Sequence, residues 1–200
     1  MSWIKHVPYE EAEGKLKKIY DKIKGPDGYI DNILMIHGLR PHTLEAHMKI
    51  YKNVLHHHKN THPKWLLETL GVYTSMLNGC EYCVEHHFTG LKRLLKDDER
   101  ANNIRKALEN ESFEDVFEEK EIALLKYTKA LTEGPANIDK SLIDEIRSYG
   151  YEDGEILEVN QVVAYFAYAN RTVLGLGVDT KGDVLGLSPS GDNPKEWSHK

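Results

Sequence analysis

The stretch EILEVNQVVAYFAYANRTVLG, residues 155–175, is apolar around most of its circumference when it is drawn as an α-helix. Such a helix must be buried on several sides, because a helix that faces solvent normally carries a broad polar stripe. We therefore expect it to lie at the centre of the protein. Two arrangements meet this expectation: the helix is enclosed by its own chain alone, or it also contacts another subunit.

Helical patterns also dominate the chain before this stretch. Residues 9–25 carry apolar side chains three and four positions apart and end at a glycine followed by a proline. Residues 63–77 end before Asn78-Gly79, another typical helix end. Residues 31–40 are ambiguous, and no segment alternates polar and apolar residues over a useful length. The sequence predicts an all-α protein, a single-domain array of seven to nine helices with no significant sheet.

The helical array is expected to cover residues 1–180, followed by an irregular C-terminal arm, residues 181–200. The arm is rich in Gly, Asp, Ser and Pro, which favour turns and loops. Trp197 is unusual in such a segment. Either it is there by chance, or it docks on a neighbouring subunit.

The composition is typical of a globular protein: of the 200 residues, 40% are hydrophobic and 29% are charged. The net charge of -6 argues against nucleic acid as a partner, because nucleic-acid-binding surfaces concentrate Lys and Arg. The N-terminus lacks the apolar core of a secretory signal, and no run of about 18 apolar residues is present that would span a membrane. We therefore expect a cytoplasmic protein, in a compartment where a structural disulfide would not persist.

Both cysteines of the chain lie in LNGCEYCVEHHF, residues 77–88. If a helix opens at Cys80, then Cys83 lies about 60° around the helix, and His87 lies within roughly 40° of both sulfurs. His86 lies about 120° from Cys80 and is the poorer partner. The spacing therefore places two thiols and one imidazole on a single stripe.

This arrangement suits redox chemistry. Only the thiolate attacks peroxides or disulfides, and an ordinary thiol is mostly protonated at neutral pH. The N-terminal end of a helix stabilises the anion, and an imidazole one turn away can take the thiol proton. A second thiol can then attack the oxidised first one and close a disulfide before further oxidation.

Two other interpretations of the thiol pair stay open. Zinc normally needs four ligands, and with two cysteines it would have to recruit His86 or His87 and a distant histidine. The cysteines can also be buried and inert. The histidine run at residues 56–58, with His62 nearby, is better explained as an exposed helix end than as a metal site, because adjacent residues point to different faces of a helix.

Three segments together resemble a known family: NGCEYCVEHH at 78–87, VPYEEAEGKLKKIYDKIKG at 7–25 and YFAYANRTVLGLGV at 165–178. They are similar to the alkylhydroperoxidase D-like (AhpD-like) branch of the carboxymuconolactone decarboxylase superfamily, and most similar to its peroxidase-related members. The resemblance covers roughly residues 5–180. The family is all-helical and forms trimers, dimers or hexamers.

The family's thiol motif is a glutamate, eleven intervening residues, and then CxxCxxxH. In this sequence the motif falls on Glu68, Cys80, Cys83 and His87. The resemblance implies that Glu68 accepts protons from the cysteines through His87, that Cys83 is the peroxidatic cysteine and that Cys80 resolves it. Tyr82 stands where well-known members have a histidine, and its phenol can still donate a hydrogen bond.

The resemblance implies a thiol-dependent peroxidase that reduces hydrogen peroxide or organic hydroperoxides, with Tyr82 and His86 as possible supporting residues. The motif implies no metal, flavin or haem cofactor. Electrons would come from a dithiol protein of the lipoyl or thioredoxin type, and the protein would be a homo-oligomer. Two alternatives remain: a thiol–disulfide oxidoreductase or redox sensor without peroxidase turnover, and a non-enzymatic helical module with a structural zinc. Lactone decarboxylation is disfavoured, because the decarboxylase members lack the cysteine pair.

Overall fold

The structure, a computed structural model, describes residues 2–25 and 28–186. Within these ranges it contains helices and no strand, which confirms the all-α prediction. Trp197 and the rest of the arm beyond residue 186 lie outside the described residues. The α-helices are α1 (Gly14–Ile23), α2 (Asn32–His37), α3 (Pro41–His56), α4 (Lys64–Leu77), α5 (Glu81–Leu95), α6 (Asp98–Asn110), α7 (Glu119–Glu133), α8 (Lys140–Ser148) and α9 (Asp153–Leu176), with short 3₁₀ helices at Tyr9–Glu11 and Pro135–Asn137.

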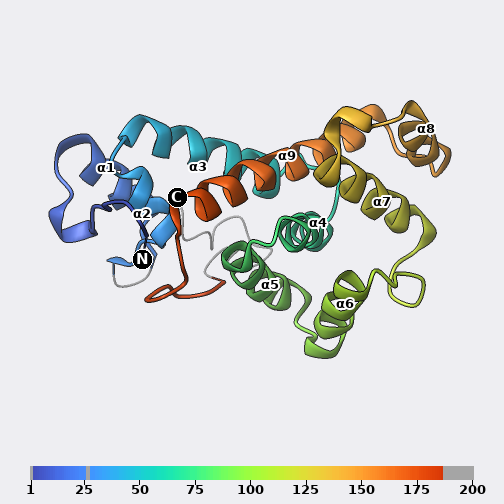
Figure 1. Cartoon of the computed structure of the whole chain (residues 1–200), viewed down its shortest axis with the longest axis horizontal. Helices are drawn as coiled ribbons and strands as arrows, with labels where there is room; N and C mark the ends of the chain where they lie inside the picture. Colours follow the sequence, from blue (N-terminus) through green and yellow to red (C-terminus); the bar gives the residue numbers. More distant parts are fainter. Residues whose placement is uncertain (1, 26–27, 187–200) are drawn as a thin grey trace.

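Helix α9 lies at the centre of the molecule, as its apolar sequence predicts. It contacts α3, α4, α5, α7 and α8, and Figure 1 shows it running lengthwise between α3 on one side and α4 and α5 on the other. Three apolar side chains of α9 are nevertheless exposed, those of Leu157, Tyr168 and Leu174. Leu157 and Tyr168 are eleven residues apart and so share one face of the helix, whereas Leu174 lies on another. The chain therefore encloses most of α9 but leaves some of its apolar residues facing outward.

Helices α4 and α5 form a tight hairpin that brings residues 64–95 together. Asn78 ends α4, and Gly79 has φ +66°, a left-handed conformation that glycine adopts without strain. Cys80 is the N-cap of α5, so the helix begins at the thiol pair, as the spacing argument assumed. Residues 31–40, whose sequence pattern is ambiguous, contain the short helix α2.

Helices α4 and α9 approach each other closely at Gly71. A side chain at this position would collide with the ring of Phe166 on α9. The same ring lies edge-on to the imidazole of His87, with the two ring centroids 4.6 Å apart. The small residue on α4 therefore lets α9 come near enough to hold a histidine of α5 in place.

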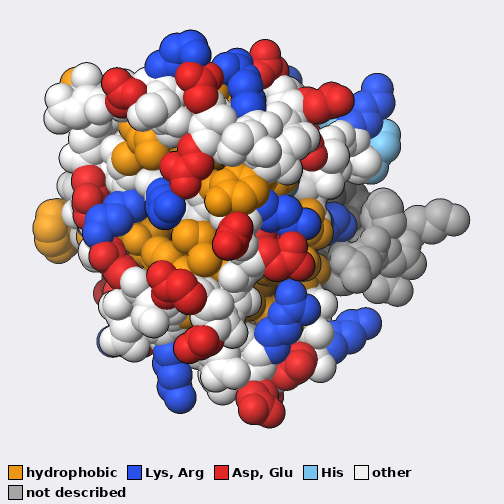
Figure 2. Space-filling view, turned by 90° about the vertical axis from the view of Figure 1, so that its right-hand side faces the viewer, with side chains coloured by type: hydrophobic (Ala, Val, Ile, Leu, Met, Phe, Trp, Pro, Cys, Tyr) orange, Lys and Arg blue, Asp and Glu red, His pale blue; other side chains and the backbone are white. Residues whose placement is uncertain are grey.

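The surface has mixed charge. Figure 2 shows the end of the molecule opposite α1, where acidic and basic side chains are interspersed around small groups of hydrophobic ones. On the face in view, no field of a single charge sign stands out. No helix in the described part of the chain is long and apolar enough to cross a membrane.

Candidate functional site

The buried carboxylate of Glu68 is the centre of the site. Glu68 lies on α4 among leucines, and its side chain is 1% exposed. His87, one helix away on α5, places Nδ1 2.7 Å from Glu68 Oε2. Because an ionised carboxylate only accepts hydrogen bonds, Nδ1 carries the proton in this contact, and Nε2 is left to accept one. The hairpin thus brings together two residues of the predicted motif.

The two thiols lie next to this pair. Cys80 and Cys83 are buried free thiols in a small cluster with Tyr82 on α5, Ile36 on α2, and Val173 and Val178 at the end of α9. Cys83 and His87 are four residues apart on α5, so they occupy the same face of the helix. The apolar surroundings exclude water from the sulfurs, and any change in their charge must be balanced by nearby polar groups.

The two cysteines differ in acidity. The neighbouring Cys83 thiol, by donating a hydrogen bond to the Cys80 sulfur, lowers the pKa of Cys80 to about 7, against the opposing effect of burial. The same contact, together with burial, raises the pKa of Cys83 well above its ordinary value. Asn170 on α9 favours the thiolate at both positions. The first negative charge of the pair therefore belongs on Cys80.

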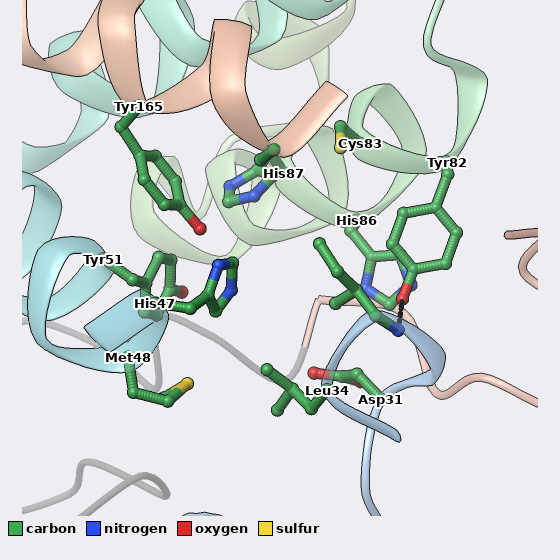
Figure 3. A pocket seen from close by; sticks show the side chains of 12 residues that line it. Asp31, Leu34, His47, Met48, Tyr51, Tyr82, Cys83, His86, His87 and Tyr165 are labelled. Carbon is green, nitrogen blue, oxygen red and sulfur yellow. Dashed lines mark hydrogen bonds between the residues drawn. The ribbon is translucent and has the colours of Figure 1, made fainter. Parts of the chain in front are cut away.

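A cavity of about 60 Å³ opens beside Cys83. Figure 3 shows its lining: Cys83, His86 and His87 come from α5, and His47 and Tyr51 from α3 face them together with Tyr165 from α9. Burial lowers the pKa of His47 to about 3, so this imidazole is neutral. Burial also keeps the pKa of Tyr165 well above its ordinary value. The wall opposite Cys83 therefore carries neutral hydrogen-bonding groups, and Leu34, Met48 and Ala169 add apolar surface.

The histidine run at residues 56–58 is only partly exposed, so the expectation for this segment is wrong at His56. The His56 side chain is 2% exposed, and its Nε2 lies 3.8 Å from Glu68 Oε1. His58, two residues later, is exposed as expected. The three adjacent histidines do point in different directions. Because α3 packs against α4, the direction taken by His56 leads into the protein interior.

His86 and Tyr82 do not join the Glu68 pair. The Tyr82 hydroxyl donates to Asp183 Oδ2 at 2.6 Å, and His86 Nε2 lies 3.1 Å from the same oxygen. Asp183 lies in the irregular segment after α9 and also accepts the backbone N–H of Asn32. The C-terminal segment is therefore fastened over the N-terminal turns of α5.

One group of side chains in the described part of the chain could hold a metal ion. It consists of Asp31, His86 and Asp183, whose ligand atoms lie within 4.8 Å of one another. Neither cysteine belongs to this group. Hydrogen bonds from Tyr82, His86 and Asn32 already serve Asp183, which is a sufficient reason for these residues to lie together.

Sequence reasoning missed three residues of the site: Asn170, Asp183 and His56. Asn170 is fully buried; it donates to the Ser75 hydroxyl, and its oxygen accepts from Asn78. An asparagine directly after the apolar run VVAYFAYA, residues 162–169, was a usable signal for it. Asp183 and His56 carried none, because their positions depend on how distant segments fold back on α4 and α5.

Comparisons with known proteins define the fold. No family model matches the sequence, and no curated protein matches it significantly. Among solved structures, a peroxidase-related protein of Ralstonia eutropha described as an alkylhydroperoxidase AhpD core has a TM-score of 0.74 at 19% identity, over 89% of this chain and 91% of that chain. A peroxidase-related protein of Silicibacter has a TM-score of 0.66 at 20% identity, over 76% of each chain.

The debrominase Bmp8 is also similar, with a TM-score of 0.65 at 22% identity over 80% of this chain and 83% of that one. The chain therefore has an AhpD-like fold, as the three sequence segments predicted. At these identities the comparisons establish the fold alone, and the neighbours themselves include proteins of different activity.

Proposed function

We propose that this protein is a thiol-dependent peroxidase that reduces hydrogen peroxide or small organic hydroperoxides through Cys80 and Cys83. The observation that carries the proposal is the buried hydrogen bond between Glu68 and His87, near a pair of free thiols of which one, Cys83, borders a cavity. An imidazole oriented by a carboxylate is a common way to activate a thiol or hydroxyl nucleophile.

In the proposed reaction Cys83 attacks the hydroperoxide, because Cys83 lines the cavity. His87 Nε2 takes the thiol proton, the sulfur attacks the outer oxygen of the O–O bond, and the alcohol or water leaves with a proton. Cys83 becomes a sulfenic acid, so the hydroperoxide has oxidised its sulfur by two electrons. Burial raises the pKa of Cys83, so this thiol needs the base that Glu68 and His87 supply.

Cys80 then resolves the sulfenic acid. In the reduced pair the Cys83 thiol lowers the pKa of Cys80 to about 7, so Cys80 is the more acidic of the two thiols. Its sulfur attacks Cys83, a disulfide forms, and the hydroxyl group leaves as water. An external dithiol must return the two electrons, and we propose a protein of the lipoyl or thioredoxin type in a cytoplasmic setting.

The cavity size favours small substrates. About 60 Å³ accommodates a few water-sized groups, which suits hydrogen peroxide or a hydroperoxide with a short organic group. We also propose a homo-oligomer, whose contact would involve the face of α9 that carries Leu157 and Tyr168 and the groove of about 600 Å³ between α9 and α3. The lining of this groove includes Ile50, which is 46% exposed, and Tyr168.

Steady-state peroxide consumption with a dithiol donor tests the proposal. A peroxidase turns over many equivalents of peroxide per chain, whereas a redox sensor or thiol–disulfide oxidoreductase forms its disulfide once and shows no sustained peroxide turnover. The zinc alternative is tested by elemental analysis of protein purified without chelators, which would find about one zinc per chain in a structural zinc module.

A further inference from the structure

The carboxylate of Glu68 lies between two imidazoles that come from different helices. His87 of α5 contacts Oε2 at 2.7 Å, and His56, the last residue of α3, lies 3.8 Å from Oε1. The side chains of Glu68 and His56 are 1% and 2% exposed. The sequence motif relates Glu68 to His87 and the cysteines, and it gives His56 no role.

A buried carboxylate is stable in its charged form only when neighbouring groups replace the water that it has lost. The hydrogen bond from His87 serves one oxygen. The other oxygen faces His56, at a distance where a protonated or polar imidazole favours the anion. Removing His56 therefore makes the charged form of Glu68 harder to maintain.

Two tyrosines are the other titratable side chains near the two histidines, and neither can carry a positive charge. Tyr51 lies edge-on to His56, with ring centroids 4.8 Å apart, and its ring centroid is 6.4 Å from that of His87. Tyr165 of α9 is fully buried, and burial keeps its pKa well above the ordinary value, so it is a neutral phenol. The two histidines are therefore the neighbours that can add positive charge.

We propose that His56 is a positioning residue of the thiol site, which keeps Glu68 ionised so that Glu68 holds His87 with Nδ1 protonated and Nε2 directed to accept the thiol proton. The inference rests on the proposed thiol chemistry. His56 acts through Glu68, and no contact with the substrate is assigned to it.

The test compares His56→Leu with His58→Leu, a matched control in the same histidine run. Loss of His56 shifts the acid limb of the turnover–pH profile to higher pH by about one unit, the lower end of the effect of removing an opposite charge. Below this limb, turnover falls roughly tenfold, since a shift of one pH unit is a tenfold change in the active fraction. His58→Leu leaves the profile unchanged, because this side chain is exposed.

His56→Gln sharpens the test, because its amide can place an N–H near the position of Nε2. It should recover part of the shift and also remain folded if the leucine variant does not. A wild-type profile in both variants would overturn the proposal. So would an equal loss of turnover at every pH, which would indicate a structural role.

A second readout separates this inference from the proposed function. The pH dependence of Cys83 alkylation is measured without peroxide in Cys80→Ser protein, with His56 intact and with each of the two His56 substitutions. If the wild type does not consume peroxide, the peroxidase proposal fails, but a shift in the alkylation profile of His56→Leu still supports the role of His56. Identical alkylation profiles would overturn that role whether or not the enzyme turns over.

Discussion

Two consecutive histidines of α5 each contact a buried carboxylate, but the two carboxylates come from different parts of the chain. His87 meets Glu68 at 2.7 Å, and His86 meets Asp183 at 3.1 Å. Glu68 lies 19 residues from its partner in a helical hairpin, whereas Asp183 lies 97 residues from its partner in an irregular segment. Both carboxylates are almost completely buried.

The difference lies in how many donors serve each carboxylate. Asp183 receives the Tyr82 hydroxyl, His86 and the backbone N–H of Asn32. Although burial opposes it, hydrogen bonds from His86, Tyr82 and Tyr29 hold the pKa of Asp183 below its ordinary value. Glu68, in contrast, accepts one hydrogen bond, from His87, and a second imidazole, that of His56, lies 3.8 Å from its other oxygen. We therefore expect the Glu68 contact to serve chemistry and the Asp183 contact to hold the C-terminal segment in place.

Replacing a cysteine of the thiol pair should reduce peroxide turnover more than any other change. In Cys83→Ser, peroxide consumption with a dithiol donor should fall to background, because the hydroxyl is a far weaker nucleophile than a thiolate. Trapping of sulfenic acid in the single Cys→Ser variants assigns the two roles. Labelling of Cys83 in Cys80→Ser is expected, and labelling of Cys80 alone would reverse the assignment.

The second-largest loss of turnover is expected when the Glu68 carboxylate is removed. Glu68→Gln keeps the shape of the side chain and removes the carboxylate that orients His87, so turnover should fall by about 10²-fold, the lower end of what one acid–base group contributes. Circular dichroism should show unchanged helicity. His87→Ala should cause a similar loss.

The double variant should lose far less than the product of the two single effects, because residues that act as one unit are non-additive. Fully multiplicative losses would mean that Glu68 and His87 act separately.

The acidity of the thiols gives a third, intermediate prediction. Cys83→Ala removes the donor that lowers the pKa of Cys80, so the midpoint of thiolate formation should rise from about 7 toward the ordinary value for a thiol. Titration by ultraviolet absorbance of the thiolate measures this midpoint. An unchanged or lower midpoint would mean that other groups, such as Asn170, set the acidity.

The two regions also show what a sequence can predict of this site. Glu68, Cys80, Cys83 and His87 lie within one hairpin, where helical spacing and a short motif determine which residues share a face. His56 reaches Glu68 through the packing of α3, and Asp183 reaches His86 through the path of the segment after α9. No local period encodes those contacts, so they could not be predicted from the sequence.

Replacing the Asp183 carboxylate with an amide should affect stability more than activity. Asp183→Asn leaves buried donors poorly matched and should lower the free energy of unfolding by about 1–3 kcal/mol, while turnover changes less than about threefold. In the wild type, the lowered pKa of Asp183 stabilises the folded state above the ordinary pKa of an aspartate. This contribution is lost as pH falls through the lower folded value. Denaturant unfolding at several pH values should show the loss in the wild type and not in Asp183→Asn.

The smallest effect on turnover is expected for His86→Ala. His86 projects toward Asp183 and away from Glu68. Its removal therefore takes one of several donors from Asp183 and leaves the contact between Glu68 and His87 intact. Turnover should remain within about threefold of the wild type, well below the 10²-fold loss expected for one positioned acid–base group. His86 and His87 are adjacent on one helix, so the two alanine variants have closely matched effects on helix propensity. If His86→Ala proves the damaging change and His87→Ala the mild one, then the proton relay runs through the C-terminal segment, and the roles assigned to the two carboxylates are reversed.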